Sequence, residues 1–201
     1  MSKNSNGARI KVSINGFGRI GRAFLKVAWE KPEIEIVAVN DLGSVENMAY
    51  LLKYDTVYGK WSHPVRAISN GTGENYIEIG GKKIKVLTEK EPSKLPWKDL
   101  NVDVVVESTG LFASYDKAKA HLDAGAKKVV ISAPAKDSAE ALFPPTGGSK
   151  SSVFGETILL GVNEEKFGTC DITSNASCTT NAASPLIAIL DETLGIEKAI
   201  L

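Results

Sequence analysis

The stretch Ile14-Asn15-Gly16-Phe17-Gly18-Arg19-Ile20-Gly21 decides the fold that we predict for this chain. It is a G-x-G-x-x-G pattern that follows a short β-branched strand, residues 9–14, and opens a helix with apolar periodicity. In such a turn Gly16 permits the tight bend, Gly18 lets the backbone approach a pyrophosphate, and Gly21 lets helix and strand pack closely. In this context the pattern predicts a dinucleotide-binding turn whose phosphates lie at the start of the helix.

The helix after this turn is expected to bury one apolar face, made of Ile20, Phe24, Val27 and Ala28. A second strand, residues 34–39, follows it and ends at Asn40-Asp41, so that Asp41 lies 20 residues beyond Gly21. An acid at this distance binds the ribose hydroxyls of the cofactor in such folds. Because its charge repels a 2′-phosphate, Asp41 favours NAD over NADP.

Strand and helix patterns continue to alternate as far as residue 132. A continuous apolar run such as 102–107 is typical of a strand that is buried on both faces of a parallel sheet. The expected elements are a helix over 44–54 capped by Ser44 with Val45, Met48, Ala49 and Leu52 buried, an antiparallel hairpin over 76–79 and 83–86, a strand over 102–107, a helix over 114–124 and a strand over 127–132. We therefore predict an α/β, doubly wound Rossmann domain with an inserted antiparallel hairpin.

Small and hydroxylated residues follow two of the predicted strands. Ligands of open parallel sheets bind beyond the carboxyl ends of the strands, so these residues are expected to face the cofactor. They are Ser108, Thr109 and Gly110 after one strand, continued by the apolar Leu111 and Phe112, and Ser132 with Ala133 after the next. The two histidines are not expected to take part: we predict a solvated loop residue for His63 and an exposed helix residue for His121.

Composition excludes several classes of partner. The 201 residues carry 24 basic and 24 acidic side chains, so no net positive charge favours nucleic acid or anionic membrane as a partner. No apolar run approaches the roughly 20 residues of a membrane span, and the polar first residues do not resemble a signal peptide. Two cysteines make no disulfide framework. These features predict a soluble, cytoplasmic protein that acts on small molecules.

A second informative stretch is Ser174-Asn175-Ala176-Ser177-Cys178-Thr179-Thr180-Asn181, just where another apolar-periodic helix begins. Ala183, Leu186, Ile187 and Leu190 follow at helical spacing. The unpaired N–H groups and the dipole of a helix start favour a thiolate, which is the nucleophilic form of cysteine. A buried structural cysteine is the alternative on these grounds alone, since free cysteines are among the most buried residues.

Taken together, these motifs resemble those of phosphorylating glyceraldehyde-3-phosphate dehydrogenase over nearly the whole chain. The stretches that carry the resemblance are 14–21, Val39-Asn40-Asp41, 51–55 (Leu-Leu-Lys-Tyr-Asp), 107–110 (Glu-Ser-Thr-Gly), 130–135 (Val-Ile-Ser-Ala-Pro-Ala) and 174–181. The resemblance implies oxidation of glyceraldehyde 3-phosphate with NAD and inorganic phosphate to 1,3-bisphosphoglycerate, in glycolysis or gluconeogenesis, by a homotetramer. It implies neither a metal nor a nucleic-acid or membrane partner.

The same resemblance implies roles for individual residues. Cys178 would be the catalytic nucleophile, and Ser177 and Thr179 would bind substrate or phosphate. The cofactor residues would be Gly16, Phe17, Gly18, Arg19, Ile20, Gly21, Asn40, Asp41, Lys90, Ser108, Thr109, Gly110, Phe112, Ser132 and Ala133. Among these, Arg19 and Ile20 would meet the pyrophosphate, Lys90 would lie near the adenine and Ser132 near the nicotinamide. Cys170 lies outside the motif and is expected to be structural.

Several features depart from the family pattern. The family's general-base histidine comes at least two dozen residues after its cysteine, so we expect this chain to be a fragment: residues 1–177 would form the dinucleotide domain, and 178–201 the first helix and strand of a truncated catalytic domain. An insertion lies between Lys136 and Gly161 and is expected to form a surface loop. The small residues in Leu42-Gly43-Ser44 loosen discrimination against NADP, and Pro185 is expected to kink the last helix or make its first turn irregular.

Two alternatives stay open. Erythrose-4-phosphate dehydrogenase shares most of these motifs, although Asn40-Asp41 favours the triose enzyme. A non-catalytic NAD-binding module is the second alternative, in which the cysteine motif would have no evident purpose.

On this interpretation the purified chain should show little aldehyde-dependent formation of NADH. A missing general base costs about 10²–10⁴ in rate. Turnover close to that of an intact member of the family would contradict the expectation.

Overall fold

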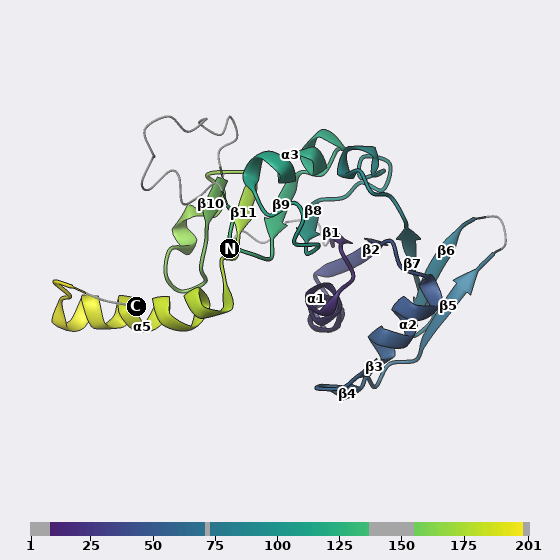
Figure 1. Ribbon diagram of the computed structural model, residues 1–201, viewed down its shortest axis with the longest axis horizontal. Helices are drawn as coiled ribbons and strands as arrows, with labels where there is room; N and C mark the ends of the chain where they lie inside the picture. Colours follow the sequence, from purple (N-terminus) through teal and green to yellow (C-terminus); the bar gives the residue numbers. More distant parts are fainter. Residues whose placement is uncertain (1–8, 71–72, 137–154, 199–201) are drawn as a thin grey trace.

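The computed structural model describes residues 9–70, 73–136 and 155–198, and it places nine strands in one sheet (Figure 1). Six strands reproduce a doubly wound order, β7-β2-β1-β8-β9-β11, in which every neighbouring pair is parallel. Their bounds are β1 Ile10–Asn15, β2 Ile34–Asn40, β7 Lys82–Leu87, β8 Val104–Glu107, β9 Lys128–Ile131 and β11 Ile172–Ser174. The predicted Rossmann fold is confirmed.

Further strands extend both edges of this sheet. β10, Gly155–Thr157, pairs in parallel with β11, while β6, Asn75–Ile79, and β5, Val65–Ser69, continue antiparallel from β7. The expected hairpin is therefore present, but its second strand, β7, is also the third parallel strand of the Rossmann unit. Neither β5, β10 nor β11 was predicted, and nor was the small separate pair of β3, Tyr54–Asp55, and β4, Gly59–Lys60.

Helices cover the two faces of the sheet. α1, Arg19–Trp29, and α2, Val45–Lys53, pack on one face, and α3, Tyr115–Asp123, packs on the other with the segment that follows η1, Pro92–Lys94. A short 3-10 turn, η2 Glu164–Lys166, precedes β11, and α5, Cys178–Leu194, follows it. Because the six central strands are parallel, their carboxyl ends lie at one edge of the sheet.

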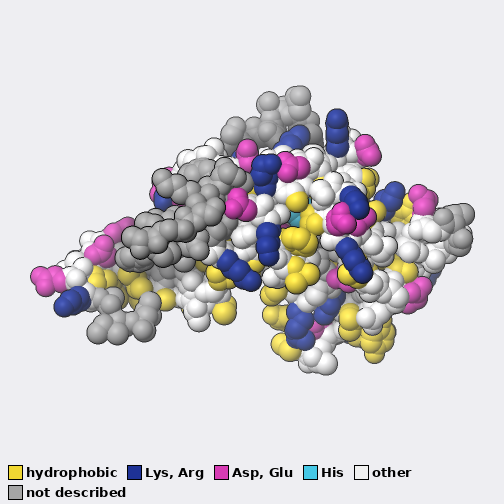
Figure 2. Space-filling model, turned by 45° about the horizontal axis from the view of Figure 1, so that its top comes forward, with side chains coloured by type: hydrophobic (Ala, Val, Ile, Leu, Met, Phe, Trp, Pro, Cys, Tyr) yellow, Lys and Arg dark blue, Asp and Glu magenta, His cyan; other side chains and the backbone are white. Residues whose placement is uncertain are grey.

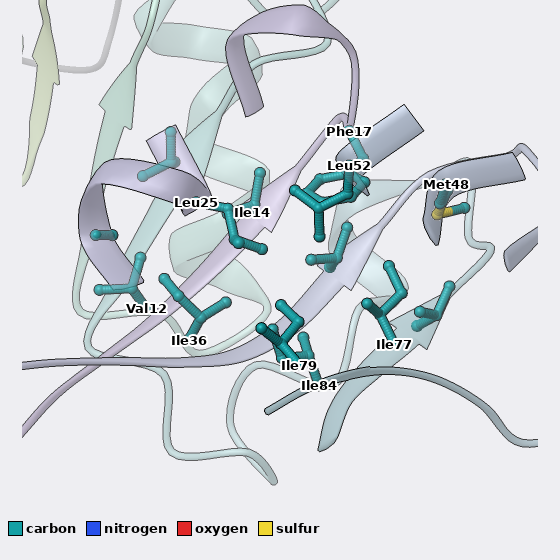
Figure 3. Close-up of a cluster of buried hydrophobic side chains, with 14 of the residues drawn as sticks. Val12, Ile14, Phe17, Leu25, Ile36, Met48, Leu52, Ile77, Ile79 and Ile84 are labelled. Carbon is teal, nitrogen blue, oxygen red and sulfur yellow. The ribbon is translucent and has the colours of Figure 1, made fainter. Parts of the chain in front are cut away.

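The largest cluster of buried side chains lies between the sheet and the helices α1 and α2 (Figure 3). Ile14 of β1, Leu25 of α1 and Leu52 of α2 are fully buried in it, and burial of each such side chain stabilises the fold by about 1.5–3 kcal/mol. The buried face of α2 is the predicted one, and Ser44 caps this helix by accepting a hydrogen bond from the Asn47 N–H.

The predicted buried face of α1 is partly wrong. Gly21, Leu25 and Ala28 are buried, whereas Ile20 and Val27 are 57% and 65% exposed. The reason is the contact of Gly21 with the turn: a Cβ there would lie 2.2 Å from the Gly16 carbonyl oxygen. Because only a glycine fits at this contact, Gly21 faces β1 and fixes the rotation of the helix.

α5 projects from the sheet in Figure 1 and buries none of its residues among the described part of the chain. Leu186, Ile189 and Leu194 are each at least 59% exposed, so the expected apolar periodicity is present without a covering layer. The helix runs unbroken through Pro185. Of residues 196–201, where a strand was expected to begin, 196–198 form none and 199–201 lie outside the described residues. Of the surface loop expected over 137–160, residues 137–154 also lie outside the described residues, and β10 occupies 155–157, so the expectation of a loop is wrong there.

The surface matches the balanced composition. Basic and acidic side chains are interspersed on the face shown in Figure 2, with no field of one sign. Within the described ranges, no helix has both the length and the apolar character that crossing a membrane requires.

Asp103 ties three strands together at the start of β8, and this suggests a test of the fold. Its carboxylate accepts hydrogen bonds from the Lys11 N–H, at 2.8 Å, and from Lys127 Nζ, at 2.6 Å. Partial desolvation alone would raise the pKa of Asp103, but these two bonds and the charges of both lysines together lower it. The ionised carboxylate is therefore more stable in the folded state than in the unfolded state.

We predict that Asp103→Asn lowers the free energy of unfolding at pH 7 by about 1 kcal/mol, since a part-exposed charged hydrogen bond is lost. A carboxylate whose pKa is lowered by folding stabilises the protein at pH values above its ordinary pKa. This contribution is lost as the pH falls through the pKa of the folded state. Urea unfolding at pH 7 and below pH 4 should therefore show the difference shrinking in acid. Asp99→Asn, on the exposed surface, is the matched control, and a difference independent of pH would contradict the prediction.

Candidate cofactor site and active site

The three glycines of the turn meet different surroundings. Gly16 has φ +91°, and a Cβ on it would lie 2.6 Å from the Thr109 N, so the segment after β8 packs directly on the turn. A Cβ on Gly21 would collide with the Gly16 carbonyl oxygen, whereas a Cβ on Gly18 would have no atom within 4 Å. Gly16 and Gly21 are thus required by the protein itself. Gly18 borders open space, as expected of a backbone that a phosphate approaches.

The start of α1 is suited to an anion. Gly18 is its N-cap and supplies no side-chain cap, so the first N–H groups of the helix are not satisfied by a capping side chain. Arg22 Nη1 donates to the Phe17 carbonyl oxygen at 2.8 Å and steadies the turn from within. The uncapped helix start and the absence of a Cβ at Gly18 fit the pyrophosphate of a dinucleotide.

Asp41 lies at the end of β2, beside the turn. Its Oδ2 accepts a hydrogen bond from the Phe17 N–H at 2.7 Å, and its Oδ1 accepts one from the Gly43 N–H at 2.9 Å. A carboxylate has about four lone-pair positions, so both oxygens retain capacity to accept ribose hydroxyls. The structure therefore brings the predicted ribose-binding acid and the glycine turn together.

The neighbouring Asn40 is placed differently from Asp41. It is 5% exposed, and its Nδ2 donates to Asn15 Oδ1 and to the Glu89 carbonyl oxygen, while its Oδ1 accepts from the Glu89 N–H. These bonds engage the amide of Asn40 inside the protein and position the end of β2, while its predicted contact with the cofactor stays a prediction.

Ser108 and Thr109, at the end of β8, lie on the other side of the turn. Ser108 Oγ lies 2.6 Å from the Gly16 carbonyl oxygen and donates to it. The Thr109 N–H and hydroxyl both donate to Glu107 Oε1, and Thr109 Oγ1 in turn accepts from the Leu111 N–H at 3.0 Å. The hydroxyl residues predicted from the strand end are thus fixed around the glycine turn.

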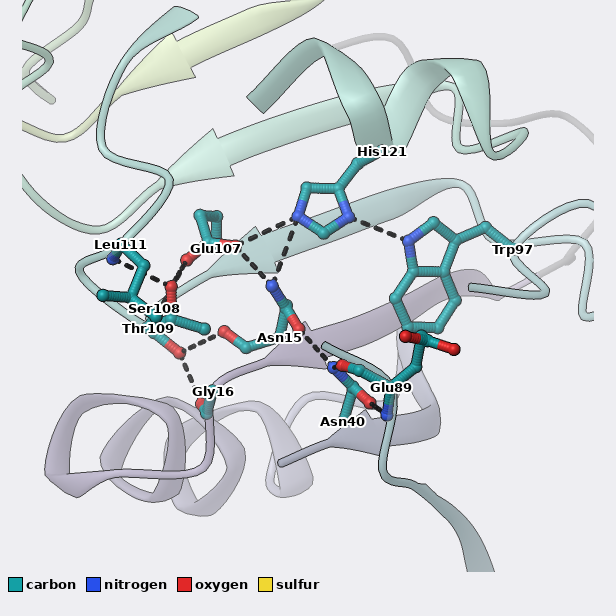
Figure 4. A network of polar contacts seen from close by, with 10 residues as sticks. All are labelled: Asn15, Gly16, Asn40, Glu89, Trp97, Glu107, Ser108, Thr109, Leu111 and His121. Atoms are coloured by element: carbon teal, nitrogen blue, oxygen red, sulfur yellow. Dashed lines mark hydrogen bonds and ion pairs between the residues drawn. The ribbon is translucent and has the colours of Figure 1, made fainter. Parts of the chain in front are cut away.

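Behind them lies a buried polar cluster that sequence reasoning missed (Figure 4). His121, predicted to be exposed, is fully buried on α3: its Nε2 lies 3.0 Å from Glu107 Oε2, and its Nδ1 lies 3.0 Å from Trp97 Nε1. Asn15 Nδ2 donates to the same Glu107 oxygen at 2.6 Å. The prediction for His121 is wrong because its partners lie 14 and 24 positions away in the sequence, which helix periodicity does not reveal.

The remaining predicted cofactor residues follow the same edge. Lys90 is exposed shortly after β7, and Gly110 is exposed and Phe112 half-buried after β8. Ser132 and Ala133 follow β9, where the Ser132 N–H donates to the Glu107 carbonyl oxygen at 2.9 Å. At the start of α1, Ile20 is exposed, and Arg19 Nη2 lies 3.7 Å from Asp55 Oδ1.

Cys178 begins α5 at the same edge of the sheet. β11 is parallel to β9 and is followed by a tight turn in which Ala176 has φ +55°, an unfavourable conformation for a residue with a side chain. Ser177 is the N-cap, and its Oγ accepts from the Thr180 N–H at 3.1 Å. Its hydroxyl also contacts Thr179 Oγ1 at 2.8 Å. Cys178 itself is exposed.

The other cysteine and the other histidine differ from this site. Cys170 is buried, and its Sγ lies 3.2 Å from the Ile172 carbonyl oxygen, in agreement with the expected structural role. His63 lies in a loop and is partly exposed, as predicted; its ring centroid lies 4.7 Å from that of Trp61, and its Nε2 lies 2.8 Å from Glu30 Oε1. Neither residue lies at the carboxyl edge of the parallel strands.

Two surface hollows, of about 440 and 400 Å³, lie elsewhere on the molecule. One lies over α2 and β5, and the other at the amino ends of β2 and β7; none of their lining residues is a predicted site residue. We place the candidate site at the open carboxyl edge instead, because the uncapped helix and the polar strand ends there supply donors and acceptors for a dinucleotide.

This fold and this edge define an NAD-binding Rossmann domain. Residues 10–115 match the family described as the NAD binding domain of glyceraldehyde 3-phosphate dehydrogenase, and the chain belongs to that family.

Curated relatives share this similarity over nearly all of the chain. Glyceraldehyde-3-phosphate dehydrogenase of Mycolicibacterium smegmatis is 48% identical over 200 residues, covering 96% of this chain and 53% of the relative. Glyceraldehyde-3-phosphate dehydrogenase 2 of Bacillus subtilis is 41% identical over 195 residues, covering 96% and 51%. The chloroplastic glyceraldehyde-3-phosphate dehydrogenase B of Pisum sativum is 44% identical over 196 residues, covering 95% and 39%. The chain thus spans about half the length of most of these relatives.

Gly18 borders open space and Gly21 touches backbone, so we predict that substitution of Gly18 affects NAD binding and substitution of Gly21 affects the stability of the fold. Gly18→Ala places a methyl group in the open space at the helix start, so we expect NAD binding to weaken about tenfold or more while the free energy of unfolding changes by about 1 kcal/mol or less. Gly21→Ala forces backbone apart and should destabilise the fold by about 1–3 kcal/mol. Calorimetric titration with NAD and urea unfolding measure both. Equal loss of stability in the two variants would contradict this account.

Proposed function

We propose that the protein is a glyceraldehyde-3-phosphate dehydrogenase that uses NAD, inorganic phosphate and Cys178 as its nucleophile. The observation that carries the proposal is the glycine turn, with its open position at Gly18 and with Asp41 bonded to the turn at Phe17. The names of the relatives support the same activity.

The chemistry begins at Cys178, which would act as a thiolate and add to the aldehyde carbon to form a hemithioacetal. Bound NAD would supply the acceptor for the hydride that this carbon loses, so that the aldehyde is oxidised to a thioester and the cofactor is reduced. Phosphate would then attack the thioester carbonyl, form the acyl phosphate and release the Cys178 thiolate. Cys178 stays covalently bound to the substrate through the first two steps, and only the attack by phosphate, which breaks the carbon–sulfur bond, returns the protein to its starting form.

The start of α5 supports this assignment. The first N–H groups of a helix have no acceptor within the helix, so the Cys178 N–H can donate to the oxyanion that develops on the substrate. Ser177 and Thr179 present hydroxyl groups beside the thiol and would bind substrate or phosphate oxygens. The strained turn at Ala176 holds the cysteine at the end of β11.

The cofactor would lie across the ends of the parallel strands. Asp41 would accept the adenosine ribose hydroxyls, the start of α1 with Arg19 and Ile20 would bind the pyrophosphate, and Lys90 would lie near the adenine. Phe112, Ser132 and Ala133 would face the nicotinamide half. Residues 1–177 would form this cofactor domain and 178–201 would belong to a second, catalytic domain, with a homotetramer and a cytoplasmic location proposed for the whole protein.

Two measurements on the purified chain test the proposal. In calorimetry we expect NAD to bind about tenfold more tightly than NADP, because the carboxylate of Asp41 repels a 2′-phosphate. In alkylation with iodoacetamide followed by mass spectrometry, exposed Cys178 should react much faster than buried Cys170, and bound NAD should change the rate at Cys178.

The outcomes separate the alternatives. NAD binding without any effect on Cys178 would favour a non-catalytic NAD-binding module, and absence of NAD binding would contradict the proposal outright. Turnover of glyceraldehyde 3-phosphate against erythrose 4-phosphate by the whole protein, rather than by this chain alone, decides between the two dehydrogenases. Cys178→Ser is the control that should remove the fast alkylation.

A further inference from the structure

The buried polar cluster next to the carboxyl edge of the parallel strands is built around the carboxylate of Glu107. Glu107 is 2% exposed, and each of its oxygens accepts two hydrogen bonds: Oε2 from Asn15 Nδ2 and His121 Nε2, and Oε1 from the N–H and the hydroxyl of Thr109. A carboxylate offers about four acceptor positions and no donor. All four acceptor positions of Glu107 are therefore occupied, and their donors come from three separate segments of the chain.

His121 has a defined protonation pattern in this cluster. Indole Nε1–H can only donate, so His121 Nδ1 must accept the bond from Trp97 and carries no proton. The proton of the neutral ring is then on Nε2, where it is donated to Glu107. His121 and Glu107 thus form a neutral donor and an anionic acceptor rather than a pair of opposite charges. Asn15 Nδ2, 3.4 Å from the same nitrogen, donates to Glu107 and not to the ring.

The bonds continue to both sides of the cofactor edge. Through Asn15 Oδ1 they reach Asn40, which precedes the ribose-binding Asp41 and is bonded to Glu89, next to Lys90. Through Thr109 they hold the segment that touches Gly16. One buried chain of bonds therefore connects the ends of β8, β1 and β2 with the segment after β7.

We propose that His121 and Glu107 are positioning residues for NAD binding, which hold the segment after β8 and the glycine turn in their binding-competent arrangement. This inference rests on the proposed function. Neither residue contacts the cofactor: both are fully or almost fully buried, and they act through Thr109 and Asn15. Loss of the bonds lowers the fraction of molecules that are ready to bind, and the apparent dissociation constant rises by the same factor.

Two substitutions at His121 form the test. The amide of His121→Gln can donate to Glu107 and accept from Trp97, as the neutral ring does, whereas His121→Leu can do neither. We expect His121→Leu to weaken NAD binding about tenfold and His121→Gln to restore most of the affinity, as measured by calorimetry. Val129→Ala, in the core beneath α3 and outside the cluster, is the control for general loss of stability.

A second readout does not depend on NAD. Nitrogen-15 NMR of the wild-type protein should show His121 as the neutral ring with its proton on Nε2. Full NAD affinity in His121→Leu, a loss of affinity in Val129→Ala as large as in His121→Leu, or a proton on Nδ1 would overturn the inference while leaving the proposed function standing. Failure of the wild-type protein to bind NAD would overturn both.

Discussion

The close contact between the glycine turn and the segment after β8 is the constraint on which the arrangement of the carboxyl edge depends. Because Gly16 has no side chain, Thr109 can approach its Cα, and Ser108 can bond to its carbonyl oxygen. Glu107 then holds the same segment from beneath. Two features thus fix the shape of the turn. Gly16 has no Cβ, so the segment after β8 can pack on it, and the carboxylate of Glu107 holds that segment through Thr109. The start of α1, where we propose that the pyrophosphate binds, takes its geometry from both contacts.

Local patterns in the sequence predicted most of the fold. The turn, the alternation of strands and helices as far as β9 and the buried face of α2 follow from residues that are close in sequence, so periodicity and glycine spacing suffice. The rotation of α1 was predicted incorrectly, although its cause is readable: if Gly21 must touch the turn, then Leu25 and Ala28 share its face and Ile20 and Val27 cannot. The edge strand β5 lacked a signal of comparable strength.

The candidate site divides in the same way. Asp41, Ser108 and Cys178 could be predicted, because each follows a strand end or begins a helix in a recognisable motif. The environment of His121 could not be predicted, since its partners Trp97 and Glu107 are brought to it only by tertiary packing. Nothing in the sequence of α3 indicates that a polar residue at position 121 is buried. Asn40 is the opposite case. It adjoins Asp41 in a recognisable motif, yet its side chain hydrogen-bonds to Asn15 and to Glu89 within the protein.

The central claim is that NAD binds at the carboxyl edge, on the glycine turn and the start of α1. Titration of nitrogen-15-labelled protein with NAD, followed through the backbone amide resonances, tests it most directly. The account predicts that the largest shifts occur at residues 16–21, at Asp41 and at Thr109, with β5 and β6 unaffected. Largest shifts at the hollow over α2 and β5, with residues 16–21 unchanged, would contradict it.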